Sequence, residues 1–239
     1  MHSGSTRGRM VGRAVIPFVA LMAAAGALSC ASYPIVGARD GSLGPSLLAP
    51  AAQKATRERI RTSESGTYIG RLLEDRDSVL DRWPDRVNDP IRVWIEPLPL
   101  RDSTSTAFEP AVIEAFAEWA NLDIPVQFRF VAQPKDAEVR VRWVDSLPNK
   151  TGSTTWRASR DGWLQSGEVM LATHLNGGRA LDARGVRAIA LHEIGHLLGL
   201  SHSFDPHDVM ASLVRVSSLS PVDCATIRLL YAFQAGHVR

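Results

Sequence analysis

Alternating hydrophobic and polar residues divide the C-terminal part of the chain into strands and helices. The alternation predicts strands at residues 91–95, 126–131, 138–144 and 167–173. Hydrophobic residues spaced three or four apart predict a helix over 110–120 with an apolar stripe toward the core. The order strand, helix, strand, strand indicates a sheet with the helix across one face.

Two more helices are marked by their capping residues. Asp182 is the predicted N-cap of a helix over 185–198. Farther along, Ser220 and Asp223 have the spacing of a capping box, with Pro221 at the first helical position. Together the patterns predict an α+β fold that is α/β-like in its first part. It contains a mixed twisted sheet with an edge strand, two long helices and a C-terminal helix.

The N-terminal part of the chain has a different composition. Residues 1–29 combine arginines with an apolar run of about 15 residues, which is typical of an export signal and shorter than the roughly 20 residues that span a bilayer. Residues 30–66 are rich in small residues, Pro and Arg, which predicts a flexible tether. Residues 67–87 carry hydrophobic side chains near one helical face, so we expect a short helical extension. The globular domain then covers 88–239.

Cys30 directly follows the apolar run. The sequence Ala27-Leu28-Ser29-Cys30 resembles the lipobox of bacterial lipoproteins, in which the cysteine becomes the lipidated N-terminus, although that pattern prefers leucine at the position of Ala27. The small residues at 27 and 29 also suit an ordinary signal peptidase, in which case Cys30 is a thiol or pairs with Cys224. We therefore expect an exported protein, either lipid-anchored in a bacterial cell envelope or secreted.

The charge of the chain argues against several partners. The formal net charge is +2 at pH 7, and Arg7, Arg9 and Arg13 of the leader contribute three positive charges, so the remainder carries +2 − 3 = −1. This balance does not favour nucleic acid or a membrane surface, which leaves the lipid anchor as the expected membrane contact. Two cysteines are too few for a disulfide framework or a cysteine-built zinc site. We expect a monomer.

The strongest chemical signal is a histidine motif. His192 and His196 are four residues apart, so on a helix they lie on one face and both can reach a single zinc ion. Gly199 allows a left-handed turn out of the helix, which brings His202 to the same ion. Three protein ligands with one open position are typical of a catalytic zinc. Glu193 lies beside the first ligand and can reach a water on the metal.

This spacing resembles that of the metzincin zinc endopeptidases. Ser203 after the third histidine and the ending 219–231 are similar to those of the matrixins among them, and the resemblance covers roughly 88–235. It implies that Met210 forms a tight turn that supports the ligands as an apolar floor. The inhibitory Pro-Arg-Cys-Gly sequence, the loop for structural zinc and calcium, and the Pro-x-Tyr after the methionine turn are not recognisable. Zinc is therefore the expected cofactor, and calcium binding stays open.

The resemblance also implies a substrate and a mechanism. A short edge strand at 153–158 would bind an extended polypeptide through main-chain hydrogen bonds, with Thr154, Thr155 and Trp156 along it. A zinc-bound water would attack the peptide bond while Glu193 acts as general base and then as general acid. Two alternatives remain open from the residues: a noncatalytic zinc-fold binding lipoprotein of the cell envelope, and an amidase that acts on cell-wall material.

Overall fold

The computed structural model describes residues 28–29, 36–39, 50–63, 65–98 and 105–238. Most of the predicted export signal and the predicted lipidation site Cys30 lie outside these residues. None of the helices in the described ranges is both long enough and apolar enough to cross a membrane.

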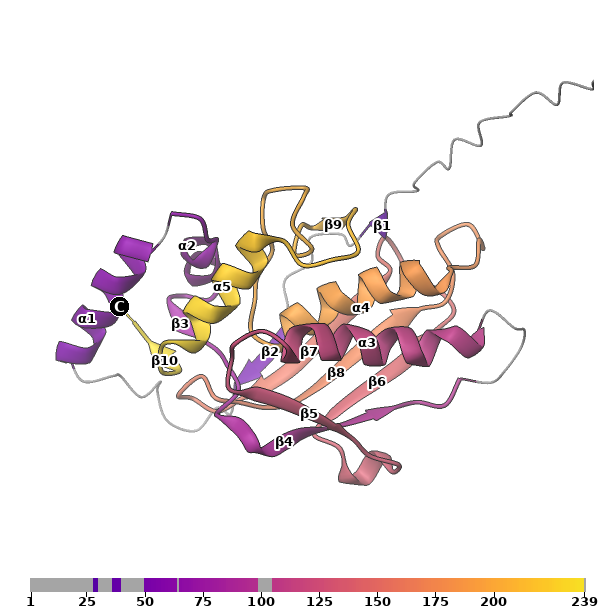
Figure 1. Cartoon of the computed structure of the whole chain (residues 1–239), viewed down its shortest axis with the longest axis horizontal. Helices are drawn as coiled ribbons and strands as arrows, with labels where there is room; N and C mark the ends of the chain where they lie inside the picture. Colours follow the sequence, from indigo (N-terminus) through magenta and orange to yellow (C-terminus); the bar gives the residue numbers. More distant parts are fainter. Residues whose placement is uncertain (1–27, 30–35, 40–49, 64, 99–104, 239) are drawn as a thin grey trace, which may run out of the picture.

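A six-stranded mixed sheet forms the centre of the molecule, as Figure 1 shows. The strands, in spatial order, are β2 (Val36–Arg39), β7 (Gly152–Ala158), β8 (Leu164–Ala172), β6 (Val139–Val144), β4 (Arg86–Ile95) and β5 (Val126–Phe130). Neighbouring strands run parallel except for the antiparallel pair β7 and β8. The α+β fold with a mixed sheet is therefore confirmed.

Helices α3 (Phe108–Ala120) and α4 (Ala183–Leu197) pack against each other on one face of the sheet (Figure 1). Their inward stripes bury Trp119, Phe116 and Ile189 almost completely. Because α4 also packs on β7 and β8, its position is fixed by both the sheet and α3. The predicted N-cap is confirmed: the Asp182 carboxylate accepts a hydrogen bond from the Gly185 amide at 2.7 Å.

Smaller elements surround this core. They are the helices α1 (Pro50–Ser63), α2 (Ile69–Asp75) and α5 (Pro221–Tyr231), the 3₁₀ turns η1 (Ser105–Ala107) and η2 (Pro134–Asp136), and the strand pairs β3 (Val79–Leu80) with β10 (Gly236–His237) and β1 (Leu28–Ser29) with β9 (Leu213–Val214). Helix α5 begins with the predicted capping box of Ser220 and Asp223.

The region before residue 88 differs from the sequence-based expectation. Helix α1 and strand β2 lie inside residues 30–66, for which composition favoured a flexible tether. Residues 50–63 are rich in Ala and Arg, which are good helix formers, and Ile60 is buried in the main core. Val79 and Leu80 belong to a strand rather than to the predicted helix, because Leu80 pairs with Gly236 near the C-terminus.

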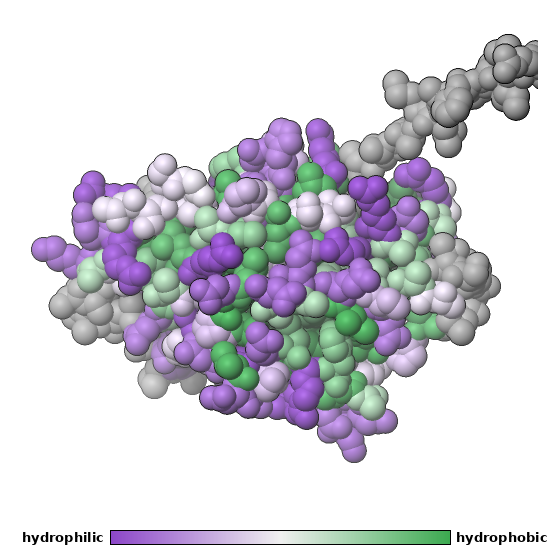
Figure 2. Space-filling view, in the orientation of Figure 1, coloured by the Kyte–Doolittle hydropathy of each residue, from purple (hydrophilic) through white to green (hydrophobic). Residues whose placement is uncertain are grey.

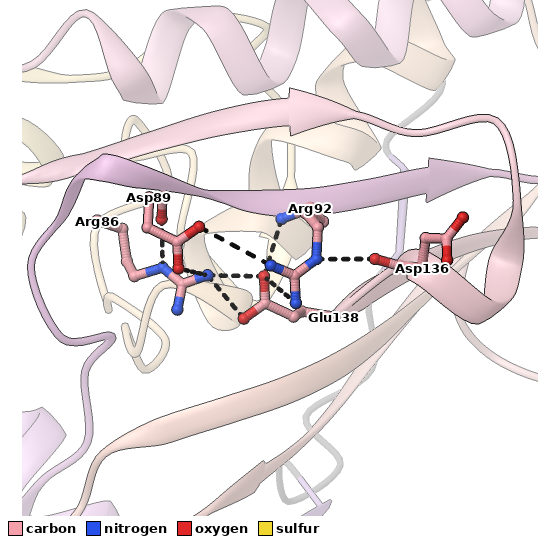
Figure 3. Close-up of polar contacts among 5 residues, drawn as sticks. All are labelled: Arg86, Asp89, Arg92, Asp136 and Glu138. Atoms are coloured by element: carbon pink, nitrogen blue, oxygen red, sulfur yellow. Dashed lines mark hydrogen bonds and ion pairs between the residues drawn. The ribbon is translucent and has the colours of Figure 1, made fainter.

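A cluster of charged side chains joins β4 to the start of β6 (Figure 3). The Arg86 guanidinium lies 2.7 Å from both carboxylate oxygens of Glu138, and that carboxylate also accepts from the Arg92 amide at 3.1 Å. Arg92 Nε donates to the Asp136 carbonyl at 2.8 Å, and Asp89 lies within 3.8 Å of both arginines. Arg86, Asp89, Arg92 and Glu138, hereafter the Glu138 cluster, thus each have a partner of opposite charge within the group.

Hydrophobic and hydrophilic residues are interspersed on the face that Figure 2 shows. The large hydrophobic side chains that the described part of the chain exposes come from separate places: Val87 in β4, Ile113 in α3, Phe130 in β5 and Phe204. Phe204 is the most exposed, at 80%, and it follows the third histidine of the motif by two residues. The Arg71 guanidinium lies 4.7 Å from the centre of its ring.

Candidate metal centre

Helix α4 places two histidines of the predicted motif on one face, and the turn after it adds the third. The Nε2 atom of His196 lies 3.0 Å from Nε2 of His192 and 3.1 Å from Nε2 of His202. The potential ligand nitrogens of the three rings lie within 4.8 Å of one another, an arrangement that can hold a metal ion. Among the described residues, no other group of three or more His, Cys, Asp or Glu side chains meets this condition.

Backbone carbonyl oxygens orient the imidazole rings of His192 and His196 through their Nδ1 atoms. Nδ1 of His192 lies 2.8 Å from the Val209 carbonyl oxygen, and Nδ1 of His196 lies 2.9 Å from that of Leu200. A carbonyl oxygen only accepts, so in the neutral ring each Nδ1 carries the hydrogen and each Nε2 keeps a lone pair. Nitrogen ligands of a tetrahedral zinc, at about 2.0–2.1 Å from the ion, stand roughly 3.3 Å apart. The observed spacing of the Nε2 atoms therefore fits one zinc ion.

Burial keeps these rings neutral. His192 is 1% exposed and His196 is 4% exposed. Burial lowers the pKa of His192 to about 3, and the nearby His202 is a second cause. Burial likewise lowers the pKa of His196 well below its ordinary value, and it lowers the pKa of the less enclosed His202. Neutral imidazole is the form that binds metal, so the ring nitrogens of these histidines can bind a metal ion at neutral and mildly acidic pH.

The turn that delivers His202 depends on Gly199. Its φ is +105°, a left-handed conformation that residues with a Cβ rarely adopt, and a Cβ there would collide with the Asp81 carbonyl oxygen. The end of α4 is also held from outside, because the Trp83 indole donates a hydrogen bond to the Leu197 carbonyl at 2.9 Å. Tertiary contacts and the glycine together fix the path from the second to the third histidine.

Met210 packs against the histidine helix. It is fully buried, and a Cβ on Gly195 would collide with its sulfur. The Asp223 carboxylate of α5 accepts from the Val209 amide at 2.8 Å and from the Tyr68 hydroxyl at 3.1 Å. Asp223 thus holds the segment whose Val209 carbonyl orients the first histidine. Nothing in the local sequence around Asp223 beyond its capping-box spacing signals this second role.

Glu193 belongs to α4, and its side chain lies against β7. Its side chain is 2% exposed, and its Oε2 atom accepts a hydrogen bond from the Thr154 hydroxyl at 2.7 Å. A Cβ on Gly152 would come within 2.6 Å of Glu193 Cγ and 2.8 Å of Cδ, which is closer than atoms can approach. Thr154 was predicted to lie along the substrate strand, but nothing in the local sequence signals its contact with Glu193.

A strand is present at the predicted position 153–158, as β7, but its outer edge is covered. Thr154 and Trp156 point inward, each 6% exposed, whereas Thr155 is half-buried on the opposite face. Strand β2 pairs with β7 in parallel and places Val36–Arg39 opposite Thr155–Ala158. The expectation of an open edge is therefore wrong for this structure. An unpaired strand edge readily pairs with another chain segment, and such a distant pairing leaves no periodic signal in the sequence.

A catalytic zinc has three protein ligands rather than four, and the three histidines can supply them. Glu193, which directly follows His192 in the sequence, is a residue type that can transfer protons. On an α+β scaffold with a mixed sheet, this combination is typical of zinc metallopeptidases. The family model of the matrixins matches residues 94–232, so the chain belongs to the matrixin family. No curated protein matches the chain. The chain is therefore a zinc metallopeptidase, a hydrolase, and the resemblance seen in the sequence is confirmed.

Proposed function

We propose that the protein is a zinc endopeptidase that hydrolyses peptide bonds within extended polypeptides. The observation that carries this proposal is the convergence of the three histidine Nε2 atoms in a chain of the matrixin family, with Glu193 directly after His192 in the sequence. His192, His196 and His202 would hold the zinc through Nε2. When bound, zinc supplies Lewis-acid chemistry: it makes a water more acidic and polarises the scissile carbonyl.

Glu193 performs the proton transfers in this proposal. Its carboxylate takes a proton from the attacking water, and it later gives that proton to the leaving amine. Burial of Glu193 at 2% exposure reduces competing contacts with bulk water and strengthens its interaction with the reacting groups. Met210 and the backbone carbonyls of Val209 and Leu200 keep the histidine rings in place.

Strand β7 is the proposed docking site for the polypeptide. Its inner edge pairs with β8, and its outer edge carries the main-chain groups that an extended peptide can bind. Four residues of β2 occupy the outer edge in the structure. Substrate binding along β7 therefore requires β2 to leave.

A peptide-library digest read by mass spectrometry tests the function. We expect cleavage within peptides by the wild-type protein, loss of cleavage with a chelator, and recovery when zinc is restored. Glu193→Ala is the matched control, because it leaves the three histidines in place. Cleavage that persists in this variant or in the chelator would contradict the proposal, and so would cleavage of peptidoglycan in parallel samples while every peptide stays intact.

We also propose that the protein is exported. Arginines followed by a short apolar run over residues 1–29, with Cys30 directly after them, support this proposal. Intact-mass analysis of the protein made in bacterial cells should find a chain that begins at or after Cys30. Entry of labelled fatty acid into the wild-type protein but not into Cys30→Ser would then assign lipidation rather than ordinary signal cleavage. A product that keeps residues 1–29 would contradict export.

A further inference from the structure

The carboxylate of Glu193 lies in a space formed by two residues of β7. On one side, Gly152 has no Cβ, and any Cβ there would overlap the Glu193 side chain. On the other side, the Thr154 hydroxyl lies 2.7 Å from Glu193 Oε2. Gly152 and Thr154 are two residues apart, so both face α4 from the same side of the strand.

We propose that Thr154 is a positioning residue that orients the Glu193 carboxylate for proton transfer, and that Gly152 provides the space for this orientation. The inference rests on the peptidase function proposed above. A general base must present a carboxylate oxygen to the water within hydrogen-bond reach. The last torsion of a glutamate side chain is broad, so packing alone fixes it poorly. A hydroxyl bonded to one oxygen determines where the other oxygen points.

The hydroxyl of Thr154 also has a second acceptor nearby. It lies 2.9 Å from the Glu193 backbone carbonyl oxygen, and a hydroxyl has only one hydrogen to donate. The shorter contact is the one to the carboxylate, and hydrogen bonds to charged oxygens are both shorter and stronger than those to neutral ones. A purely structural role would act through the backbone contact, so an experiment must separate the two acceptors.

Steady-state kinetics of Thr154→Val tests the positioning role. Valine keeps the shape of threonine and removes the hydroxyl. We expect kcat to fall about tenfold while KM and zinc content stay at wild-type values, because the lost interaction orients a group that acts in the transition state. Thr154→Ser, which keeps the hydroxyl, should recover most of kcat. Thr173→Val is the matched control: Thr173 is also buried, and its hydroxyl contacts Val144 and His174 rather than Glu193.

A thermal-unfolding cycle on the metal-free protein gives a readout that does not depend on activity. Thr154→Val should lower Tm by several degrees in the wild-type background and by clearly less in the Glu193→Ala background, because only the first still has the carboxylate. Equal losses in both backgrounds would assign the hydroxyl to the backbone carbonyl and overturn the inference. A kcat of Thr154→Val equal to that of the wild type would overturn it as well.

The outcomes separate this inference from the proposed function. A zinc-loaded wild-type protein that cleaves no peptide would contradict both the peptidase proposal and the positioning role of Thr154. If the wild-type protein is fully active and Thr154→Val is equally active, only the positioning role of Thr154 is contradicted, and the peptidase proposal stands. Gly152→Ala gives a further check, since displacement of the Glu193 side chain by a methyl group should reduce kcat at least as much as Thr154→Val.

Discussion

The histidine site, on α4 and the turn after it, and the Glu138 cluster, on β4 and the start of β6, are both built from polar side chains, but their charges are balanced differently. In the Glu138 cluster, arginines and carboxylates neutralise one another at distances from 2.7 to 3.8 Å (Figure 3). In the histidine site, three neutral rings bring their Nε2 atoms together with no acidic partner in the metal-binding group. The first arrangement is complete as it stands and stabilises the fold. The histidine site is completed only when a cation binds to its three Nε2 atoms.

The largest expected effect comes from the proton-transfer group. Glu193→Ala should lower kcat by a factor of roughly 10²–10⁴, because general acid–base catalysis contributes about that much. Zinc content should remain near one ion per chain, since all three histidines are unchanged. Peptide-cleavage rates and metal analysis on the same preparation check both parts. Near-normal turnover in Glu193→Ala would remove this residue from the mechanism.

The Glu138 cluster should show the opposite behaviour. Glu138→Gln leaves Arg86, whose side chain is only 13% exposed, without its closest charge partner. We expect the free energy of unfolding to fall by about 2 kcal/mol, with kcat and zinc affinity unchanged. Denaturant unfolding measures the loss, and Asp89→Asn is the control, because Asp89 is 69% exposed and should matter by less than about 0.5 kcal/mol. A change in zinc affinity in Glu138→Gln would contradict the separation of the two regions.

Loosening β2 should affect substrate binding and leave the metal in place. Gly37→Pro combined with Ala38→Pro removes two backbone donors from the strand that pairs with β7. We expect KM for an extended peptide to fall severalfold, because the substrate no longer competes with β2. Gly37→Ala with Ala38→Gly keeps both donors and serves as the control. An unchanged KM in the proline variant would show that the peptide does not bind along this edge.

The smallest effect concerns pH. In the folded, metal-free protein, the pKa of His192 falls from its ordinary 6.5 to about 3. At a pH between these two values, His192 therefore binds a proton in the unfolded chain but stays neutral in the folded one. Stability should therefore fall as the pH drops below 6.5, by about 1 kcal/mol at pH 5.5 for this histidine alone. His192→Gln, unfolded by denaturant at pH 7.5 and 5.5, should lose less stability over that range. An equal loss in both proteins would contradict the expected shift.

The sequence predicted the histidine site well because its chemistry is local. His192 and His196 are one helical turn apart, and Gly199 is required by a backbone conformation that few residues adopt. Strands β4, β5, β6 and β8 were predicted for the same reason, since alternation is visible over a few residues, whereas β2 was not predicted.

What the sequence did not predict depends on contacts between distant segments. The bond from Thr154 to Glu193 joins residues 39 positions apart, and the pairing of β2 with β7 joins segments more than 100 positions apart. Neither contact has a periodic pattern of its own. Asp223 is similar: its capping-box spacing was evident, but its bond to the Val209 amide exists only once α5 has packed beside the methionine turn.

We expect His192, His196 and His202 to bind one zinc ion that peptide cleavage requires. Titrating zinc into the metal-free protein, with the cleavage rate of one peptide followed at each addition, tests this most directly. We predict that the rate rises linearly and reaches its plateau at one equivalent, and that His202→Ala gives no comparable rise. A metal-free protein that cleaves at the full rate, or a plateau that needs a second equivalent, would contradict the account.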